Sequence, residues 1–433
     1  MGFVAAATFT GVLGVPTAST AATSPLDNPF FSYTGKEPLS QVPPGTVLKT
    51  RTVPYTIQGL PILLKAIQVQ FRTKDAIGKP AIGITTVVRP ILPLQQTVKV
   101  VSYQSFYDSL NREDQPSAAI AGGQGLGKGI VNAETLLIAP LLLAGFTVNI
   151  PDTQGQNADF AAGPEYGVVT LDSLKAISNV AATGVGTKSP IGLIGYSGGA
   201  IGTEWAAEQA PAYAPTISKR IVGSAFGGVL VSPIHNLHYA DGSFGWSGVV
   251  AMALVGLSRA YHVDLTPYLS DYGKTLTTTL QKASISEAIF QYPDLTFAKM
   301  VKPQYAVPET IKPLVTIGNK LIMGTYGTPT APMFIGQGTG GEVEGTMGNK
   351  PGIGPGDGVM IAGDVRSLAR KYCAKGVTIT HREYPLSHIG TVALWLPEAL
   401  PWLLARFTDT PAQSNCATIQ PGNSIAPITY VGK

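Results

Sequence analysis

A serine lies at the centre of the glycine-rich segment Gly195-Tyr196-Ser197-Gly198-Gly199. Residues 191–194 before it form an apolar run, and residues 200–210 after it have helical character. A Gly-x-Ser-x-Gly pattern between a strand and a helix is typical of a sharp turn that raises a nucleophilic serine above a sheet. Glycines suit such a turn because side chains there would collide with the neighbouring strand and helix. The simpler alternative is an ordinary glycine-rich strand–helix turn, in a chain that has 50 glycines.

Segments of strand and helix character alternate through most of the 433 residues. A proline-rich lead-in at 24–47 comes first, followed by β-rich runs at 67–71 and 82–88. Strands alternating with helices indicate an α/β fold with a mostly parallel central sheet flanked by crossover helices. The pattern predicts strands at 98–104, 146–150, 191–195, 221–224, 333–338 and 377–384, and helices at 133–144, 168–181, 359–372 and 391–407.

Residues 233–328 interrupt this alternation. They contain helical stretches at 249–257 and 276–290, with prolines and tyrosines scattered among them. We interpret the segment as a helical lid inserted over the C-terminal edge of the sheet, where ligands enter folds of this kind. The mature chain is thereby divided into an N-terminal part of the core, 23–232, the lid, 233–328, and a C-terminal part of the core, 329–433.

The first 22 residues carry no charged side chain, begin apolar and end in small residues. They predict a secretory signal peptide, 1–22, cleaved near Ala21 or Ala22, and therefore a protein that is secreted or associated with the cell envelope. In an exported protein the only two cysteines, Cys373 and Cys416, predict one disulfide that ties the tail back to the domain.

Composition excludes several classes of function. The formal net charge is only +4 and no block of lysine and arginine occurs, so a nucleic-acid partner is not expected. Histidines are not clustered and no further cysteines are present, which argues against a zinc or redox site; no metal and no cofactor are expected. After residue 22, no segment is expected to be apolar enough to span a bilayer.

A nucleophilic serine in such a fold requires an acid and then a histidine, in that order along the chain. Of the five histidines, His388 lies in a loop between a predicted strand and the last helix, where the base belongs. His381 lies inside a strand-like run and is interpreted as structural. The remaining histidines precede the acid and are candidates only for the cleft wall: His235, His238 and His262.

The acid should follow the strand at 333–336, and four carboxylates do so: Glu342, Glu344, Asp357 and Asp364. Asp357 is favoured because it stands at a loop-to-helix junction, with Glu342 as the alternative. Asp364 is expected to make a surface ion pair near Arg366 or Arg370. The oxyanion hole should use the backbone N–H of Gly198 and a second N–H from the loop 103–109, whose donor residue the chemistry leaves open.

Several further segments accompany the serine motif. Together they resemble the secretory lipase family of the Candida antarctica lipase A type, over most of the mature chain. The likeness is carried by Pro44-Gly45 and Arg51, 71–75, 85–90, 102–104, 107–109, 195–199, 357–359 and Tyr372-Cys373 before His388.

This resemblance implies an α/β-hydrolase fold with a helical lid and an acyl-binding tunnel. It implies Ser197, Asp357 and His388 as the triad and Asp108 and Gly198 as the oxyanion residues. A bridge between the two cysteines also suits the family. The sequence departs from the family pattern in the glycine-rich loop before the acid, residues 338–356, which is longer than expected.

The expected activity is that of a secreted serine lipase or carboxylesterase that hydrolyses triacylglycerols or related lipid esters through an acyl-enzyme. Alternatives on the same triad are a short-chain esterase, an acyltransferase or a polyester hydrolase. A non-enzymatic alternative is an exported binding protein with a vestigial triad. The expected partners are the ester substrate and a lipid interface. Apolar lid residues are expected either to line the acyl site or to form only the core of the lid: Trp246, Val249, Val250, Met252, Leu254, Val255 and Leu257.

Overall fold

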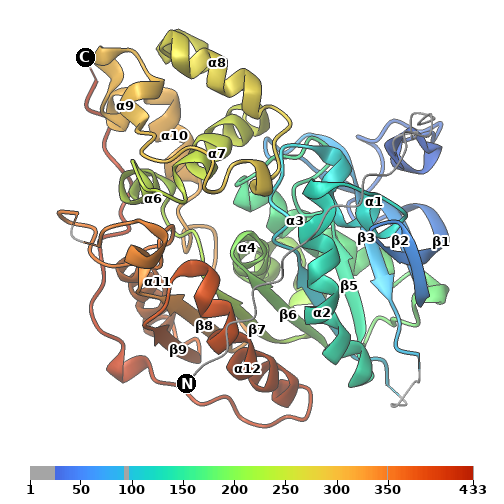
Figure 1. Ribbon diagram of the computed structural model, residues 1–433. Helices are drawn as coiled ribbons and strands as arrows, with labels where there is room; N and C mark the ends of the chain where they lie inside the picture. Colours follow the sequence, from blue (N-terminus) through green and yellow to red (C-terminus); the bar gives the residue numbers. More distant parts are fainter. Residues whose placement is uncertain (1–24, 92–96, 349, 433) are drawn as a thin grey trace, which may run out of the picture.

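The computed structural model describes residues 25–91, 97–348 and 350–432, so the predicted signal peptide lies outside the described residues. The described residues form a nine-stranded sheet in the order β1-β2-β3-β5-β4-β6-β7-β8-β9 (Figure 1). The pairs β1–β2, β2–β3 and β3–β5 are antiparallel, and the pairs from β5 to β9 are parallel, as a mostly parallel sheet requires. The strands are β1 Val47–Ile57, β2 Leu60–Lys74, β3 Pro80–Val88, β4 Val100–Gln104, β5 Thr147–Pro151, β6 Ile191–Tyr196, β7 Ile221–Gly227, β8 Met333–Gly338 and β9 Ile379–Tyr384.

Helices cover both faces of this sheet. Ile191 and Leu193 of β6 share one apolar cluster with α3, α4 and α11, whereas Ile194 shares another with α2 and α12. Because both faces are buried, inner parallel strands such as β6 and β7 are largely apolar, which makes them recognisable in the sequence. The edge strand β9 differs, since its Arg382 and Glu383 are exposed. The helices are α1 Pro116–Ile120, α2 Gly129–Leu143, α3 Gly163–Ile177, α4 Gly198–Tyr213, α5 Pro215–Ser218, α11 Ala362–Ala374 and α12 His388–Arg406.

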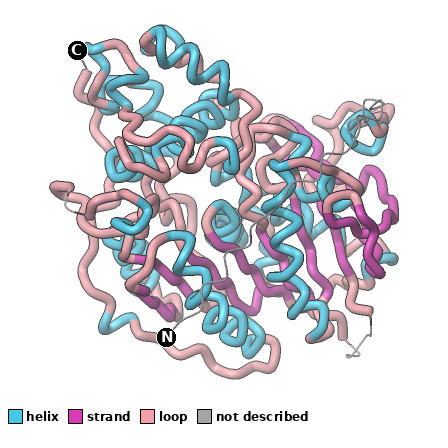
Figure 2. The backbone as a smooth tube through the Cα atoms, viewed as in Figure 1, coloured by secondary structure: helices cyan, strands magenta, loops and turns pink. Residues whose placement is uncertain are grey.

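The predicted lid segment is built of helices and loops (Figure 2) and has an apolar cluster of its own. It covers the carboxyl end of β6, because Ser197 and residues of α6 and α7 line one cavity. The end of the chain runs beside it: the N–H of Val431 donates to Glu309 O at 3.0 Å, and Asn319 bonds the backbone of Ile428. The helices are α6 Pro233–Ala240, α7 Ser247–Ala260, α8 Asp271–Leu280, α9 Phe297–Met300 and α10 Lys312–Lys320.

One predicted lid helix, 276–290, is wrong as a single element. α8 ends at Leu280, and Ser284 caps a separate short turn at Ile285–Glu287. The chain bends again at Phe290, whose φ of 59° lies outside the right-handed helical region. The apolar residues of α8 and of the turn after it pack against the same lid cluster. Their spacing in the sequence therefore resembles that of one continuous helix.

The expectation that no segment after residue 22 is apolar enough to span a bilayer is also wrong by composition. Leu126–Leu143 is long and apolar enough to cross a membrane, the one such helix among the described residues. It nevertheless packs on the sheet through Ile138 and Leu141. Its Glu134 is buried and accepts hydrogen bonds from Tyr103 and from the N–H of Phe106, both at 2.9 Å. These contacts are those of a helix in the outer layer of a globular fold.

Candidate active site

Ser197 occupies a sharp turn between β6 and α4. Its φ of 55° and ψ of −122° lie in a sparsely populated region, which such a turn requires. A β-carbon on Gly195 would overlap the carbonyl of Gly199, and one on Gly199 would overlap the carbonyl of Gln104. The glycines of the motif are therefore needed for close packing of strand and helix, and the helix begins immediately behind the serine.

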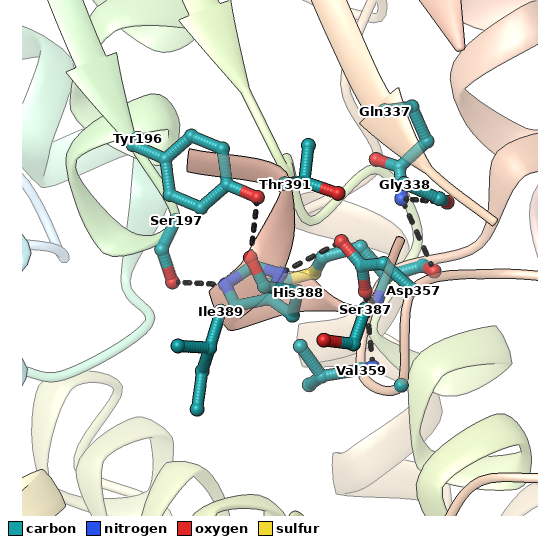
Figure 3. A network of polar contacts seen from close by, with 12 residues as sticks. Tyr196, Ser197, Gln337, Gly338, Asp357, Val359, Ser387, His388, Ile389 and Thr391 are labelled. Carbon is teal, nitrogen blue, oxygen red and sulfur yellow. Dashed lines mark hydrogen bonds and ion pairs between the residues drawn. The ribbon is translucent and has the colours of Figure 1, made fainter. Parts of the chain in front are cut away.

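Ser197, His388 and Asp357 are joined by a chain of hydrogen bonds (Figure 3). His388 Nε2 lies 2.8 Å from Ser197 Oγ, and His388 Nδ1 lies 2.7 Å from Asp357 Oδ2. A carboxylate at Nδ1 selects the tautomer in which Nδ1 carries the proton, so Nε2 accepts from the serine hydroxyl. His388, expected in a loop, is the first residue of α12.

The backbone holds Asp357 rigidly. Its Oδ1 accepts from the N–H of Val359 at 3.1 Å and from that of Met360 at 2.7 Å. Its carbonyl accepts from the N–H of His388 at 2.6 Å, so the acid and the base are also joined through the main chain. The alternative acid, Glu342, is exposed and makes no contact with His388 in the described structure.

Charges around His388 favour its protonated form. Burial lowers the pKa of His388, but the charge and hydrogen bond of Asp357, followed by the charges of Glu344 and Asp108, raise the pKa above its ordinary value overall. The site thereby stabilises an imidazolium, which forms when a base takes the proton of a serine hydroxyl.

Asp108 and Gly198, the predicted oxyanion residues, lie together beside Ser197 in the cavity wall. Burial raises the pKa of Asp108 to about 7, opposed by the charge of His388 and by hydrogen bonds from the backbone N–H groups of Asp108 and Gly198 and from Gln154. Gln154 Nε2 donates to Asp108 Oδ1 at 3.2 Å. Burial outweighs these contacts, which lower the pKa of the carboxyl but do not return it to its ordinary range.

A largely apolar cavity opens at Ser197. The structure places the predicted Trp246, Val250 and Leu254 in its wall, together with Val249 and Leu257. Two predicted lining residues lie elsewhere. Met252 is fully buried in the lid cluster, and Val255 lines a neighbouring cavity. The apolar stripe of α7 thus forms both a cavity wall and part of the lid core.

The other four histidines do not line this cavity. His235 Nδ1 lies 2.9 Å from Asp364, and His238 Nε2 lies 2.7 Å from Glu309. Burial lowers the pKa of His381 in β9 to about 4, which fits the structural role expected of it. His262 is exposed in the loop after α7.

The ion pair expected of Asp364 with a nearby arginine is wrong. Asp364 is buried and accepts from Asn423 Nδ2 at 2.8 Å as well as contacting His235. Arg366 instead pairs with Glu383, and Arg370 donates to the carbonyl of a tail residue. Neither arginine is on the face of α11 that carries Asp364.

Two residues near the proposed triad have contacts that were not predicted, although Glu344 was among the four candidate acids. Tyr196 donates its hydroxyl to the carbonyl of His388 at 2.7 Å. Glu344 accepts from the N–H of Ile389 at 2.9 Å and from Trp246 Nε1 at 2.7 Å. Tyr196 belongs to the serine motif and Glu344 follows the strand before the acid, but their partners are distant in the sequence.

Cys373 at the end of α11 and Cys416 in the tail form a disulfide across 43 residues. It fastens the tail to the face of the core that α11 covers. Within the described residues, no group of three or more histidine, cysteine, aspartate and glutamate side chains is arranged to hold a metal ion.

Comparisons with known proteins agree with this geometry. A family model described as secretory lipase matches residues 125–415. Lipase A of Arthroderma benhamiae is 30% identical, over 94% of this chain and 86% of its own. A Mycobacterium tuberculosis protein named a probable inactive lipase is 28% identical, over 94% and 88%. A crystal structure of Candida antarctica lipase A in its closed state superposes with a TM-score of 0.78 at 26% identity, over 95% and 92%. The chain belongs to the secretory lipase family and is an ester hydrolase with the α/β-hydrolase fold.

Proposed function

We propose that Ser197, His388 and Asp357 are the catalytic triad with which this lipase hydrolyses acyl esters. The observation that supports the assignment most strongly is the unbroken hydrogen-bond chain from Ser197 Oγ through His388 to Asp357, at the wall of an apolar cavity. Asp357 orients the imidazole and stabilises its protonated form, and the burial of all three side chains keeps water from competing for these bonds.

In the proposed mechanism, Ser197 Oγ attacks the ester carbonyl carbon while His388 Nε2 takes its proton. The N–H groups of Gly198 and Asp108, two residues beside Ser197 in the cavity wall, stabilise the oxyanion. His388 then donates the proton to the departing alcohol oxygen, and the acyl group remains on Ser197. A water molecule, deprotonated by His388, releases the fatty acid and restores the serine.

The proposed substrates are triacylglycerols or related lipid esters, whose acyl chain lies against Trp246, Val250 and Leu254. The apolar wall supports this choice because an acyl chain gains about 0.8 kcal/mol for each buried methylene. A short-chain esterase, an acyltransferase and a polyester hydrolase use the same triad and differ in chain length or acceptor.

An exported protein with a vestigial triad is the second candidate, favoured by the 28% identical relative that is named a probable inactive lipase. A fluorophosphonate probe separates the two candidates, because only an activated serine reacts with it quickly. We expect mass spectrometry to locate the label on Ser197, and the variant His388→Ala to label far more slowly. A folded protein that remains unlabelled would support the vestigial candidate.

We also propose that the protein is secreted and that residues 1–22 are removed on export. The small residues at Ala21 and Ala22 and the family's name support this proposal. The N-terminal sequence of protein recovered from culture medium should begin just after these alanines. Recovery only from the cell interior, with residues 1–22 attached, would contradict it.

A further inference from the structure

Glu344 is a buried carboxylate that contacts both the lid and the helix of the catalytic histidine. It ends the short turn Gly341–Glu344 in the long glycine-rich loop before Asp357 and is only 5% exposed. Its two oxygens accept from different elements, Oε2 from Trp246 Nε1 at 2.7 Å and Oε1 from the N–H of Ile389 at 2.9 Å. A buried carboxylate is costly unless hydrogen-bonded, and both of its partners are neutral N–H groups.

The bond to Ile389 places this carboxylate at the N-terminus of α12. The first N–H groups of a helix lack partners within the helix, and here each has one outside it. The N–H of His388 donates to Asp357 O, that of Ile389 to Glu344, and that of Gly390 to Ser387 Oγ at 3.3 Å. A carboxylate at this end of the helix is also favoured by the helix dipole.

The bond to Trp246 connects the same carboxylate to the lid. Trp246 immediately precedes α7, lines the cavity, and meets His388 edge to face with ring centroids 5.0 Å apart. The backbone reinforces the contact, since the N–H of Gly245 donates to Glu344 O at 3.1 Å. The start of the lid and the start of α12 therefore share one anchor, 44 residues away from His388 in sequence and adjacent to it in space.

We propose that Glu344 is a positioning residue for catalysis, which holds Trp246 and the N-terminus of α12 together around His388 and supplies a second negative charge to its imidazolium. The inference rests on the proposed triad and goes beyond it. Neither carboxylate oxygen of Glu344 contacts the imidazole of His388. Glu344 therefore acts through the two N–H groups that it binds, those of Trp246 and Ile389, and through the electrostatic effect of its negative charge.

Substitutions can distinguish the effects that the individual charged groups around His388 have on its pKa. Asp357 faces it from the loop before α11, Asp108 from the loop after β4, and Glu344 from the turn after β8, with Tyr196 below from β6. Asp357 and Glu344 both raise the pKa of His388 through their charge. Removing the charge of Glu344 alone should therefore lower the pKa of the catalytic base while leaving the triad complete.

The test compares the pH dependence of kcat/KM for p-nitrophenyl butyrate in four proteins: wild type, Glu344→Gln, Trp246→Phe and Glu342→Gln. We expect E344Q to move the acidic limb to lower pH by about half a unit or more, and to lose about threefold or more in kcat/KM at the optimum. W246F keeps the negative charge of Glu344, so the acidic limb of its kcat/KM profile should stay at the pH of the wild type. E342Q removes an exposed carboxylate from the same turn and should match the wild type.

An E344Q limb that coincides with that of the wild type would overturn the proposal, as would an equal shift in E342Q. If E344Q does not fold, Glu344→Asp replaces it. This variant keeps the charge but is too short for both donors, so kcat/KM should fall with the limb unmoved, and an unchanged kcat/KM would refute positioning. A wild type without Ser197-dependent turnover would instead refute the proposed triad itself.

Discussion

At the scale of single residues, the close packing of Asp108 against Gly198 restricts the site most. The carboxyl of Asp108 lies against Gly198, where it would overlap a β-carbon, and both residues adjoin Ser197 in the cavity wall. Asp108 itself has a φ of 31°, an unusual value for a residue with a side chain. Two strained positions, Asp108 and Ser197, thus face each other where the oxyanion is proposed to form, and each restricts what its neighbour can be.

A β-carbon at position 198 should therefore damage catalysis. In Gly198→Ala the added methyl group would overlap the buried carboxyl of Asp108, so either this carboxyl or the backbone that carries the donor N–H has to move. We expect kcat for p-nitrophenyl butyrate to fall roughly 100-fold or more, the usual cost of a lost oxyanion donor. The matched control is Gly129→Ala at the start of α2, where nothing lies within 4 Å of the new carbon. Wild-type kcat in G198A would show that Gly198 does not serve as that donor.

At the scale of secondary-structure elements, α7 separates two cavities. One side of this helix lines the cavity at Ser197, and the other lines a second cavity within the lid. Leu254 of α7 and Leu314 of α10 line both cavities. An acyl chain that passes these two leucines would gain further apolar contact inside the lid.

A bulkier side chain between the two cavities should shorten the preferred acyl chain. We expect Leu254→Trp to retain turnover of p-nitrophenyl butyrate within about threefold and to lose about tenfold or more on p-nitrophenyl palmitate, since several buried methylenes are displaced. Leu136→Trp, at an exposed leucine of α2, makes the same exchange away from the cavity and serves as control. An unchanged chain-length profile in L254W would show that acyl chains do not reach Leu254.

Much of the fold and the proposed triad followed from local sequence patterns. The parallel strands were visible because both their faces are buried, and Ser197, Asp357 and His388 follow the order of the fold along the chain. Buried polar contacts between distant segments were not visible. Gln68 and Gln70 look like the outer face of a strand, yet both are buried, with side-chain amides that donate to backbone carbonyls far along the chain.

The same limit explains the error at Asp364 and why Glu344 was considered only as a candidate acid and not for its contacts to the lid and to α12. Neighbours in the same helix suggested an arginine partner for Asp364, whereas its partners, His235 and Asn423, come from the lid and the tail. The role of Glu344 depends on Trp246, which lies nearly a hundred residues earlier in the chain. Contacts of this kind depend on how the lid sits on the core, which no local pattern specifies.

At the scale of the whole molecule, the residues of the site come from distant parts of the chain. Asp108 comes from the first part of the core, Trp246 from the lid, and Asp357 and His388 from the last part. The tail is joined to α11 by the disulfide and then runs along the lid as far as Val431. Core and lid therefore line one cavity, in which Ser197 and an apolar wall lie together, while the tail braces the lid from outside that cavity.

The most direct test of this account is the rate of hydrolysis of p-nitrophenyl esters from acetyl to palmitoyl by the purified mature chain, with Ser197→Ala as the blank. We predict Ser197-dependent turnover that persists or rises toward the long chains, and a variant that retains only the residual rate of about 10³–10⁴ over water expected without a triad member. Turnover confined to acetyl and butyryl esters would contradict the acyl site in the lid. Equal rates for the wild type and S197A at every chain length would contradict the triad.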